Sequence, residues 1–182
     1  GVYYTPRYIV DYIVKNTVGK LLEGKTPEEA SALTVVDPAC GSGSFLLGAY
    51  QYLLDWHEQY YLEHDPESFA RGKSPALVPM GAGVFRLSTA ERKRILVNNI
   101  YGVDIDAQAV EVTKLSLLLK LLEGEDEGTL AQQLTMSLGK AERVLPDLGQ
   151  NISGGNSLIG SDFYKGQQWG LWLLDDEEMY RI

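Results

Sequence analysis

Cysteine and histidine are scarce in this sequence. Its 182 residues include one cysteine, Cys40, and two histidines, His57 and His64. A single cysteine cannot form an internal disulfide, which excludes a disulfide-stapled secreted domain. Three such side chains are also too few for a Cys/His zinc site, so we expect no metal.

Basic charge and long hydrophobic runs are also in short supply. The 16 lysines and arginines are outnumbered by 25 aspartates and glutamates, for a net charge of -9, whereas a duplex-binding surface is usually basic. We therefore do not expect this chain to be the main surface that grips a nucleic acid. The longest apolar run, 115–122, is interrupted by Lys120 and is too short to span a membrane. No secretory signal is visible, so we expect a cytoplasmic protein without membrane contact.

What is present is the composition of an ordinary folded domain. Hydrophobic residues make up 45% and charged residues 23% of the chain, which suffices for a core without disulfides or metals. The chain begins at Gly1 rather than methionine and ends after an acidic run. We therefore expect both ends to be cuts in a longer protein.

Capping residues and apolar periodicity predict the helices. Thr5 and Pro6 are expected to open the first helix, with the Thr5 hydroxyl as its cap. Capping boxes predict further starts at 26–29 and 88–91, and Asp106 is expected to cap another helix. The predicted helices cover residues 5–22, 26–33, 45–61, 88–98, 106–122 and 129–138.

Three short runs containing valine or isoleucine predict strands at 33–36, 101–105 and 151–153. The strands alternate with the helices, an order typical of a parallel sheet with crossover helices, so the predicted fold class is α/β. Residues 64–87 hold several prolines and glycines without periodicity, and we expect an insertion loop there.

Acidic residues and glycines gather where the first two predicted strands end. Asp37 follows the first strand and precedes a loop with Gly41 and Gly43, where the missing β-carbons allow close approach of a ligand. The next helix offers free amides to electron-rich groups. Asp104 ends the second strand, where a carboxylate can accept hydrogen bonds from both hydroxyls of a ribose. Because ligands bind at one edge of such a sheet, these features predict a nucleoside-containing cofactor.

The loop differs from the common phosphate-binding loops. It lacks the lysine of a nucleoside-triphosphate loop, and Leu46 stands where a dinucleotide loop needs its third glycine. Asp37 would repel a pyrophosphate but would attract a ligand that carries an ammonium and a sulfonium group. We therefore expect S-adenosylmethionine rather than NAD.

Four motifs together resemble a known family. Residues 37–45, Asp-Pro-Ala-Cys-Gly-Ser-Gly-Ser-Phe, resemble the S-adenosylmethionine-binding signature of amino-group DNA methyltransferases, especially the adenine-N6 class. The run 4–6, Tyr-Thr-Pro, is similar to a motif that in one subgroup touches the methionine end of the cofactor. Residues 102–106 resemble the ribose-binding motif, and 155–158 with 162–163 resemble the motif that meets the cofactor's adenine amino group. The Tyr-Thr-Pro type is most similar to restriction–modification and phage-defence methyltransferases.

This resemblance implies the first half of a Rossmann-like S-adenosylmethionine-dependent methyltransferase fold with extra N-terminal helices. The parent protein would bind DNA as its partner and transfer a methyl group from S-adenosylmethionine to the N6 atom of adenine. The implied regions are an N-terminal helical part (1–32), a cofactor-binding part (33–163, with the insertion 64–87) and an acidic, tryptophan-containing segment (164–182). The residues implied to bind the cofactor are Thr5, Asp37, Ala39, Gly41, Gly43, Asp104, Ile105, Asn156 and Ser157.

The family's catalytic motif is missing from this sequence. An Asn/Asp/Ser-Pro-Pro-Tyr/Phe run would follow the fourth strand, and no proline occurs after Pro146. We therefore expect a chain cut before its active site and inactive by itself, without catalytic residues. Two alternatives stay open: a parent that methylates a protein glutamine or RNA, and a non-catalytic binding module with a methyltransferase-like fold.

Other conspicuous residues have structural interpretations. Cys40 is expected to be a small buried packing residue, and the histidines to be structural or exposed. The aromatic residues of 50–61 predict a core helix rather than a base-stacking platform, because no basic residues interleave with them. Arg86 and the run 92–94 are expected to form a solvated helix face, with contact to the DNA backbone as the alternative.

Truncation would also change the sheet. The first strand, normally central in this fold, would become an edge with unpaired amides. We expect self-association, or covering by the segment that contains Trp169 and Trp172, to protect it.

Overall fold

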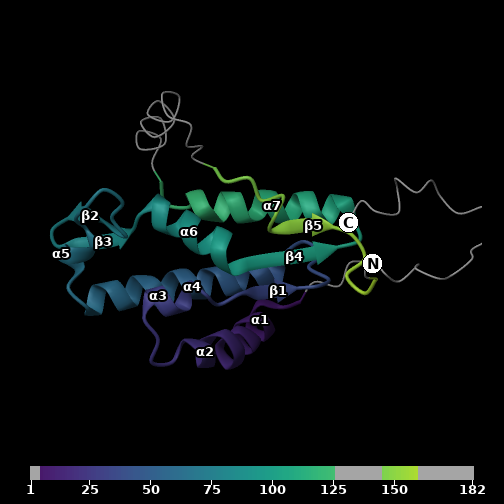
Figure 1. Cartoon of the computed structure of the whole chain (residues 1–182), viewed down its shortest axis with the longest axis horizontal. Coiled ribbons are helices and arrows are strands. Elements are labelled where there is room, and N and C mark those ends of the chain that lie inside the picture. The colour runs from purple at the N-terminus through teal and green to yellow at the C-terminus, as the bar shows by residue number, and fades with distance from the viewer. Residues whose placement is uncertain (1–4, 126–144, 160–182) are drawn as a thin grey trace, which may run out of the picture.

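A parallel β-sheet forms the centre of the protein. The computed structural model describes residues 5–125 and 145–159 (Figure 1). Within them, the strands β1 (Val35–Asp37), β4 (Ile100–Asp104) and β5 (Ile152–Gly154) pair in the order β1–β4–β5, all parallel. The α/β class and the three predicted strands are confirmed. The predicted helix at 129–138, Tyr4, the 162–163 motif and the segment 164–182 lie outside the described residues.

Helices flank this sheet. Two long ones, α4 (Ser44–Glu63) and α7 (Ala107–Leu122), follow β1 and β4 respectively. The remaining elements are α1 (Arg7–Val14), the π-helix η1 (Lys15–Gly19), α2 (Lys20–Leu22), α3 (Pro27–Ala30), α5 (Pro66–Phe69), β2 (Leu77–Gly81), β3 (Val84–Leu87) and α6 (Thr89–Asn99). No helix in the described ranges is long and apolar enough to cross a membrane.

The helix α4 is the central packing element. It contacts the sheet, α6 and α7 on one side and α1 on the other (Figure 1). Leu46, Tyr50 and Leu53 are fully buried in the core, which confirms the predicted core helix. On the α1 side, a β-carbon at Gly48 would lie 2.4 Å from the Val10 Cγ1 atom, so only glycine lets the two helices approach this closely.

Two buried asparagines anchor the beginnings of β4 and β5. Asn99 donates from Nδ2 to the carbonyl oxygens of Ala30 (2.9 Å) and Leu33 (2.6 Å), which ties the chain before β1 to the chain before β4. Asn151 donates to the carbonyl of Ile100 at 2.9 Å and thereby fixes the start of β5 against β4. The buried amide groups of these side chains thereby find acceptors inside the protein.

The N-terminal helix differs from the prediction in two respects. It begins at Arg7 with Pro6 as N-cap and has no side-chain cap, so the predicted cap by Thr5 is wrong. The reason is that the helix starts one residue later than expected, so that Pro6, which has no polar side chain, is at the N-cap position. The predicted continuous α-helix is also interrupted by the π-helix of 15–19.

The prediction that 64–87 is a loop is wrong, because this segment has secondary structure of its own, whereas its being an insertion stays a prediction. After α5, the strands β2 and β3 form an antiparallel hairpin in which Leu77 pairs with Leu87 and both are buried. Its turn has positive φ angles at Gly81, Ala82 and Gly83. The glycines that suggested a loop therefore serve a tight turn, where this conformation requires them.

The predicted solvated basic face is also wrong for its arginines. Arg92 donates to the carbonyl oxygens of Lys120 and Glu123 at the end of α7. Arg86 donates to the carbonyl oxygen of Gly124, the residue after Glu123, and forms an ion pair with Glu125 at 3.1 Å. These guanidinium groups satisfy the free carbonyls at a helix C-terminus, where positive charge is favourable.

A buried polar cluster joins α4 to α6. The Glu91 carboxylate accepts hydrogen bonds from the Tyr61 hydroxyl at 2.7 Å and from the Arg94 guanidinium at 2.6 and 2.8 Å. Burial alone would raise the pKa of Glu91, but the bonds from Arg94 and Tyr61 outweigh it and hold that pKa below its usual value. Only half of the predicted capping box forms, because Ser88 accepts from the Glu91 amide while the Glu91 carboxylate is used in this cluster.

The strand β1 lies at the edge of the described sheet. Among the described residues it pairs with β4 alone, and Val36 on its outer face is 56% exposed. This arrangement is the one from which self-association was predicted, and self-association stays a prediction.

We predict that Glu91→Gln lowers the free energy of unfolding at pH 7 by about 1–3 kcal/mol, because it leaves Arg94 with an incomplete partner. The control is Glu67→Gln, which breaks the exposed 2.9 Å pair with Arg71 and should cost less than about 1 kcal/mol. Urea unfolding measures both.

The difference between wild type and Glu91→Gln should also depend on pH. The folded-state pKa of Glu91 lies below the ordinary value of 4.5, so its stabilisation is complete above that pH and is lost as the pH falls through the folded-state pKa. A difference that stays constant down to pH 2 would contradict this account.

Candidate functional site

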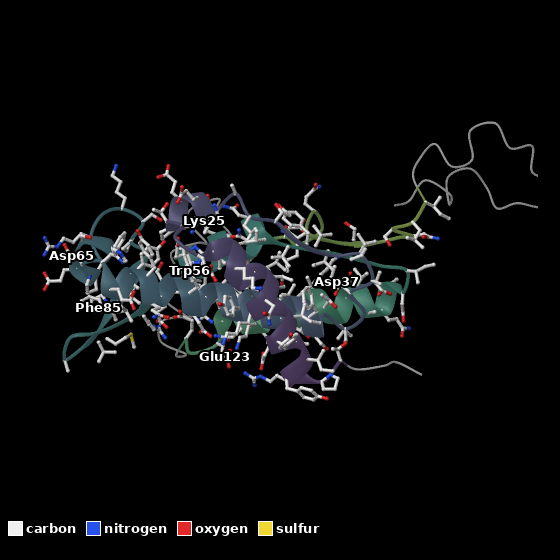
Figure 2. The ribbon with its side chains drawn as sticks, turned by 90° about the horizontal axis from the view of Figure 1, so that it is seen from below. Lys25, Asp37, Trp56, Asp65, Phe85 and Glu123 are labelled. Atoms are coloured by element: carbon white, nitrogen blue, oxygen red, sulfur yellow. The ribbon has the colours of Figure 1, made fainter. Side chains whose placement is uncertain are left out.

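The carboxyl ends of the three strands meet at one end of the molecule. Because β1, β4 and β5 are parallel, Asp37 at the end of β1 and Asp104 at the end of β4 lie at the same end of the sheet (Figure 1). From here on, this end, where the strands finish, is called the sheet edge. Figure 2 shows Asp37 towards that end, far along the long axis from Asp65. This edge is where α/β proteins bind ligands.

The Asp104 carboxylate connects the loops at this edge. Its Oδ2 atom accepts a hydrogen bond from the Gly41 amide at 2.7 Å, and its Oδ1 atom accepts one from the Asp106 amide at 2.9 Å. The carbonyl oxygen of Asp104 accepts from the Gly155 amide at 2.9 Å. One residue therefore fixes the loop after β1, the start of α7 and the loop after β5.

The loop after β1 is held by further bonds on its inner side. The Cys40 amide donates to the Val103 carbonyl at 2.9 Å, and the Gly43 amide donates to the Cys40 carbonyl at 2.8 Å. The hydroxyl of Thr113, on α7, donates to the Gly41 carbonyl at 2.8 Å. The loop conformation is thus set by β4 and α7 as well as by its own sequence.

The two loop glycines meet different surroundings. Gly43 has a φ of +80°, and a β-carbon there would lie 2.7 Å from the Thr113 Cγ2 atom. Gly41 has a φ of +53°, but a β-carbon there would meet no atom within 4 Å. Gly43 is therefore required for internal packing, whereas Gly41 borders open space.

The long helix α4 starts at this edge without a side-chain cap. Its N-cap is Gly43, which has no side chain to accept from the free amides. In contrast, α3, α6 and α7 are capped by Thr26, Ser88 and Asp106. The amino end of α4 therefore leaves amides available to an electron-rich ligand group.

Cys40 is buried beneath the loop, as predicted, with 6% of its surface exposed. Burial and the neighbouring charges of Asp37 and Asp104 raise the pKa of its thiol to about 11. The thiol is therefore protonated at neutral pH and is a poor nucleophile.

The loop after β5 also lies at the sheet edge and contacts the loop after β1. The Ser157 hydroxyl donates to the Pro38 carbonyl at 2.7 Å, and Asn156 Oδ1 accepts from the Leu158 amide at 3.0 Å. Ile105 is 78% exposed beside Asp104.

The structure thus brings eight of the nine predicted residues to one sheet edge. The ninth residue, Thr5, is exposed ahead of α1, and its side chain makes no hydrogen bond to any residue in the described ranges. The eight are Asp37, Ala39, Gly41, Gly43, Asp104, Ile105, Asn156 and Ser157.

Thr113 is a residue of this site that the sequence analysis did not identify. It is fully buried and contacts the loop through both its hydroxyl and its methyl group. The available signal was a hydroxyl on the buried stripe formed with Val110 and Leu117. A polar residue on an apolar stripe needs a partner, but the sequence alone does not say which one.

Comparison with known proteins finds similarity to DNA methyltransferases. The family described as "MmeI, DNA-methyltransferase domain" matches residues 18–160. The type II restriction enzyme and methyltransferase RM.Eco57I of Escherichia coli is 36% identical over 157 residues, or 86% of this chain and 14% of that protein. A putative type II restriction enzyme and methyltransferase of Methanocaldococcus jannaschii, RM.MjaORFECS2P, is 30% identical over 88% of this chain and 14% of its own length. The chain therefore spans about 14% of the length of these two relatives.

Two further similarities are weaker. The adenine-specific methyltransferase BrxX of Escherichia coli is 26% identical over 81% of this chain and 13% of that protein. A solved structure of a nuclease-deletion mutant of the Type ISP restriction–modification enzyme LlaGI, in complex with a DNA substrate mimic, has a TM-score of 0.45 and 20% identity. It covers 70% of this chain and 8% of the solved chain.

We predict that Gly43→Ala destabilises the protein by about 2–4 kcal/mol, because backbone strain and a clash with Thr113 combine there. Gly41→Ala should cost only the strain, about 1–2 kcal/mol. Gly24→Ala is the control for strain alone, since Gly24 has a φ of +70° and open space around it. Equal losses for all three variants in urea unfolding would show that the contact with Thr113 is unimportant.

Proposed function

This chain belongs to the MmeI DNA-methyltransferase domain family, and from that premise we propose that it is the cofactor-binding part of an enzyme that methylates adenine N6 in DNA. The methyl donor would be S-adenosylmethionine. The main support for the proposal is that Asp37, Asp104 and the backbone of Gly41, which no side chain covers, lie together at one sheet edge.

The groups at this edge fit S-adenosylmethionine. When bound, this cofactor supplies an electrophilic methyl group on a sulfonium, and it also carries an ammonium group, a carboxylate and a ribose. The Asp37 carboxylate would attract the positive groups. The uncapped amides of α4 would receive the carboxylate. Open space at Gly41 would let the cofactor approach the backbone.

Asp104 would both build the site and bind the ribose. Each of its carboxylate oxygens accepts one backbone amide and keeps a further lone pair for a ribose hydroxyl. Ile105, exposed next to it, would cover one face of the adenine. Asn156 would offer its carboxamide to the adenine amino group, since Oδ1 keeps a lone pair beyond the bond from Leu158.

The names of the relatives support a proposal for the substrate, the location and the biological role of the parent protein. Their names describe restriction enzymes with methyltransferase activity and adenine-specific methyltransferases. We therefore propose DNA adenine as the substrate, cytoplasm as the location, and restriction–modification or phage defence as the role of the parent protein. The sequence contains no Asn/Asp/Ser-Pro-Pro-Tyr/Phe run, so this chain would hold the cofactor and would not by itself transfer the methyl group.

We predict that Asp37→Asn weakens the binding of S-adenosylmethionine about tenfold or more. An asparagine preserves the acceptor for the Ala39 amide, which lies 3.1 Å from Oδ1, and removes only the charge. The matched control is Asp147→Asn, since Asp147 accepts from the Gly149 amide in the same way at 2.9 Å. Isothermal titration calorimetry measures both, and equal affinities would contradict the role of Asp37.

The substrate proposal is tested with the parent protein. We expect it to transfer a tritiated methyl group to DNA and to yield N6-methyladenine by mass spectrometry, with no transfer to RNA or protein. The present chain should show no transfer. Modification of a glutamine side chain or of RNA by the parent would contradict the proposal, even if the cofactor bound as expected.

A further inference from the structure

A hollow lies between the N-terminal helices and α4. It is an open groove of about 620 Å³, within the range of small-molecule sites. We call it the aromatic groove and define it by Tyr52, Trp56 and Tyr60 on α4 and by Lys15, Lys20 and Lys25 on the facing segment. Figure 2 shows Trp56 and Lys25 close together and Asp37 well away from both. The groove is therefore separate from the sheet edge described above.

One wall of the groove is an aromatic stripe. Tyr52, Trp56 and Tyr60 recur every fourth residue on α4 and are half-buried, unlike the core residue Tyr50. The rings of Trp56 and Tyr60 are 5.7 Å apart, and His64 stacks on Tyr60 at 4.1 Å. These flat surfaces at the groove are suited to stacking with another flat ring.

The other wall is basic in a chain that is acidic overall. Three lysines line the groove against one carboxylate, Glu23, although the whole chain has a net charge of -9. Within the described ranges, Lys15 and Lys20 form no ion pair. Lys25 lies near Glu29 and contributes to the lowered pKa of that carboxyl, after the hydrogen bonds from Thr26.

From the sequence, a base-stacking platform on α4 was not expected, because no basic residues interleave with its aromatic residues. That reason does not hold in the folded protein. No lysine or arginine occurs among the aromatic residues of α4, but the turn from η1 to α3 brings lysines to them from a distant part of the chain. Aromatic rings interleaved with cations are the combination that binds nucleotides without base-specific contacts.

The π-helix shapes the groove. Residues 15–19 form η1, and π-helical turns are rare and frequently occur at functional sites. Gly19 at its end lies against Tyr52, and a β-carbon there would be 2.6 Å from the Tyr52 hydroxyl oxygen. The irregular helix and its glycine thus let the N-terminal segment approach the aromatic wall.

We propose that the aromatic groove binds a nucleotide, with the base stacked on Trp56 and Tyr60 and the phosphate held by Lys15 and Lys20. The nucleotide can come from two sources, a free mononucleotide or an unpaired nucleotide in a DNA strand. Both offer the same ring and the same phosphate. This inference does not depend on cofactor binding at the sheet edge.

The test uses the full chain with Trp169 and Trp172 replaced by phenylalanine, so that Trp56 is its single tryptophan. The probes are ATP, dAMP, a six-nucleotide (dT) oligonucleotide, adenosine and inorganic phosphate. Stacking on Trp56 should quench its fluorescence with the three nucleotide probes. As read from this quenching, adenosine and phosphate should each bind the groove at least about tenfold more weakly, since each lacks one of the two recognised groups.

Substitutions assign the binding to the two walls. Trp56→Ala should weaken calorimetric affinity about tenfold or more, whereas Trp56→Phe should retain most of it. Lys15→Gln combined with Lys20→Gln should weaken binding and reduce its dependence on salt. Lys73→Gln is the matched control, because Lys73 is an exposed lysine outside the groove. Lys15 and Lys20 are exposed as well, so their replacement leaves the core untouched and the variant folded.

The outcomes separate the possibilities. Tighter binding of the oligonucleotide than of ATP and dAMP supports the DNA strand as source, and the reverse supports a free nucleotide. Absence of quenching, or affinities unchanged by the Trp56→Ala and lysine variants, would overturn the proposal. Binding of a synthetic peptide of residues 169–182, with no binding of nucleotides, would overturn it too and would assign the groove to an acidic peptide. Asp37→Asn should leave nucleotide binding unchanged, so failure here is distinguishable from failure of the proposed function.

Discussion

The hydrogen bonds made by Asp104 are the interaction on which the candidate site depends. Its carboxylate holds the Gly41 and Asp106 amides, and its carbonyl holds the Gly155 amide. Through its carboxylate and its carbonyl oxygen, this one residue therefore joins three loops that start from three places in the chain. The site is consequently shaped by the protein before any ligand is present, which lowers the cost of ordering the loops on binding.

The helix α4 extends this organisation across the molecule. Its uncapped amino end lies at the sheet edge, its middle forms the wall of the aromatic groove, and its last turns carry Tyr61 into the cluster with Glu91. Its contacts with the sheet, α1, α6 and α7 make it the shared support of all three features.

The errors of the sequence analysis have a common physical origin. The arginines of 86–94 look like a solvated face because sequence spacing does not show that the carbonyl ends of α7 lie beside them. Glycines and prolines between 64 and 87 indicate irregular structure equally well whether they form a loop or a hairpin turn, and only the pairing of Leu77 with Leu87 decides. The aromatic residues of α4 lack neighbouring cations along the chain but have them across the groove. In each case the deciding partner is far away in sequence.

The sequence by itself determined the local features: the α/β order, the strand ends at Asp37 and Asp104, the glycines that need positive φ, and the helix caps at Thr26 and Asp106. These follow from backbone sterics and from hydrogen bonds over a few residues, which a short stretch of chain specifies. Only the tertiary structure decided that Thr113 supports the glycine loop, that arginines close the end of α7, and that lysines face an aromatic wall. Such contacts depend on packing between distant segments, and the sequence around a side chain does not specify which distant residue will become its partner.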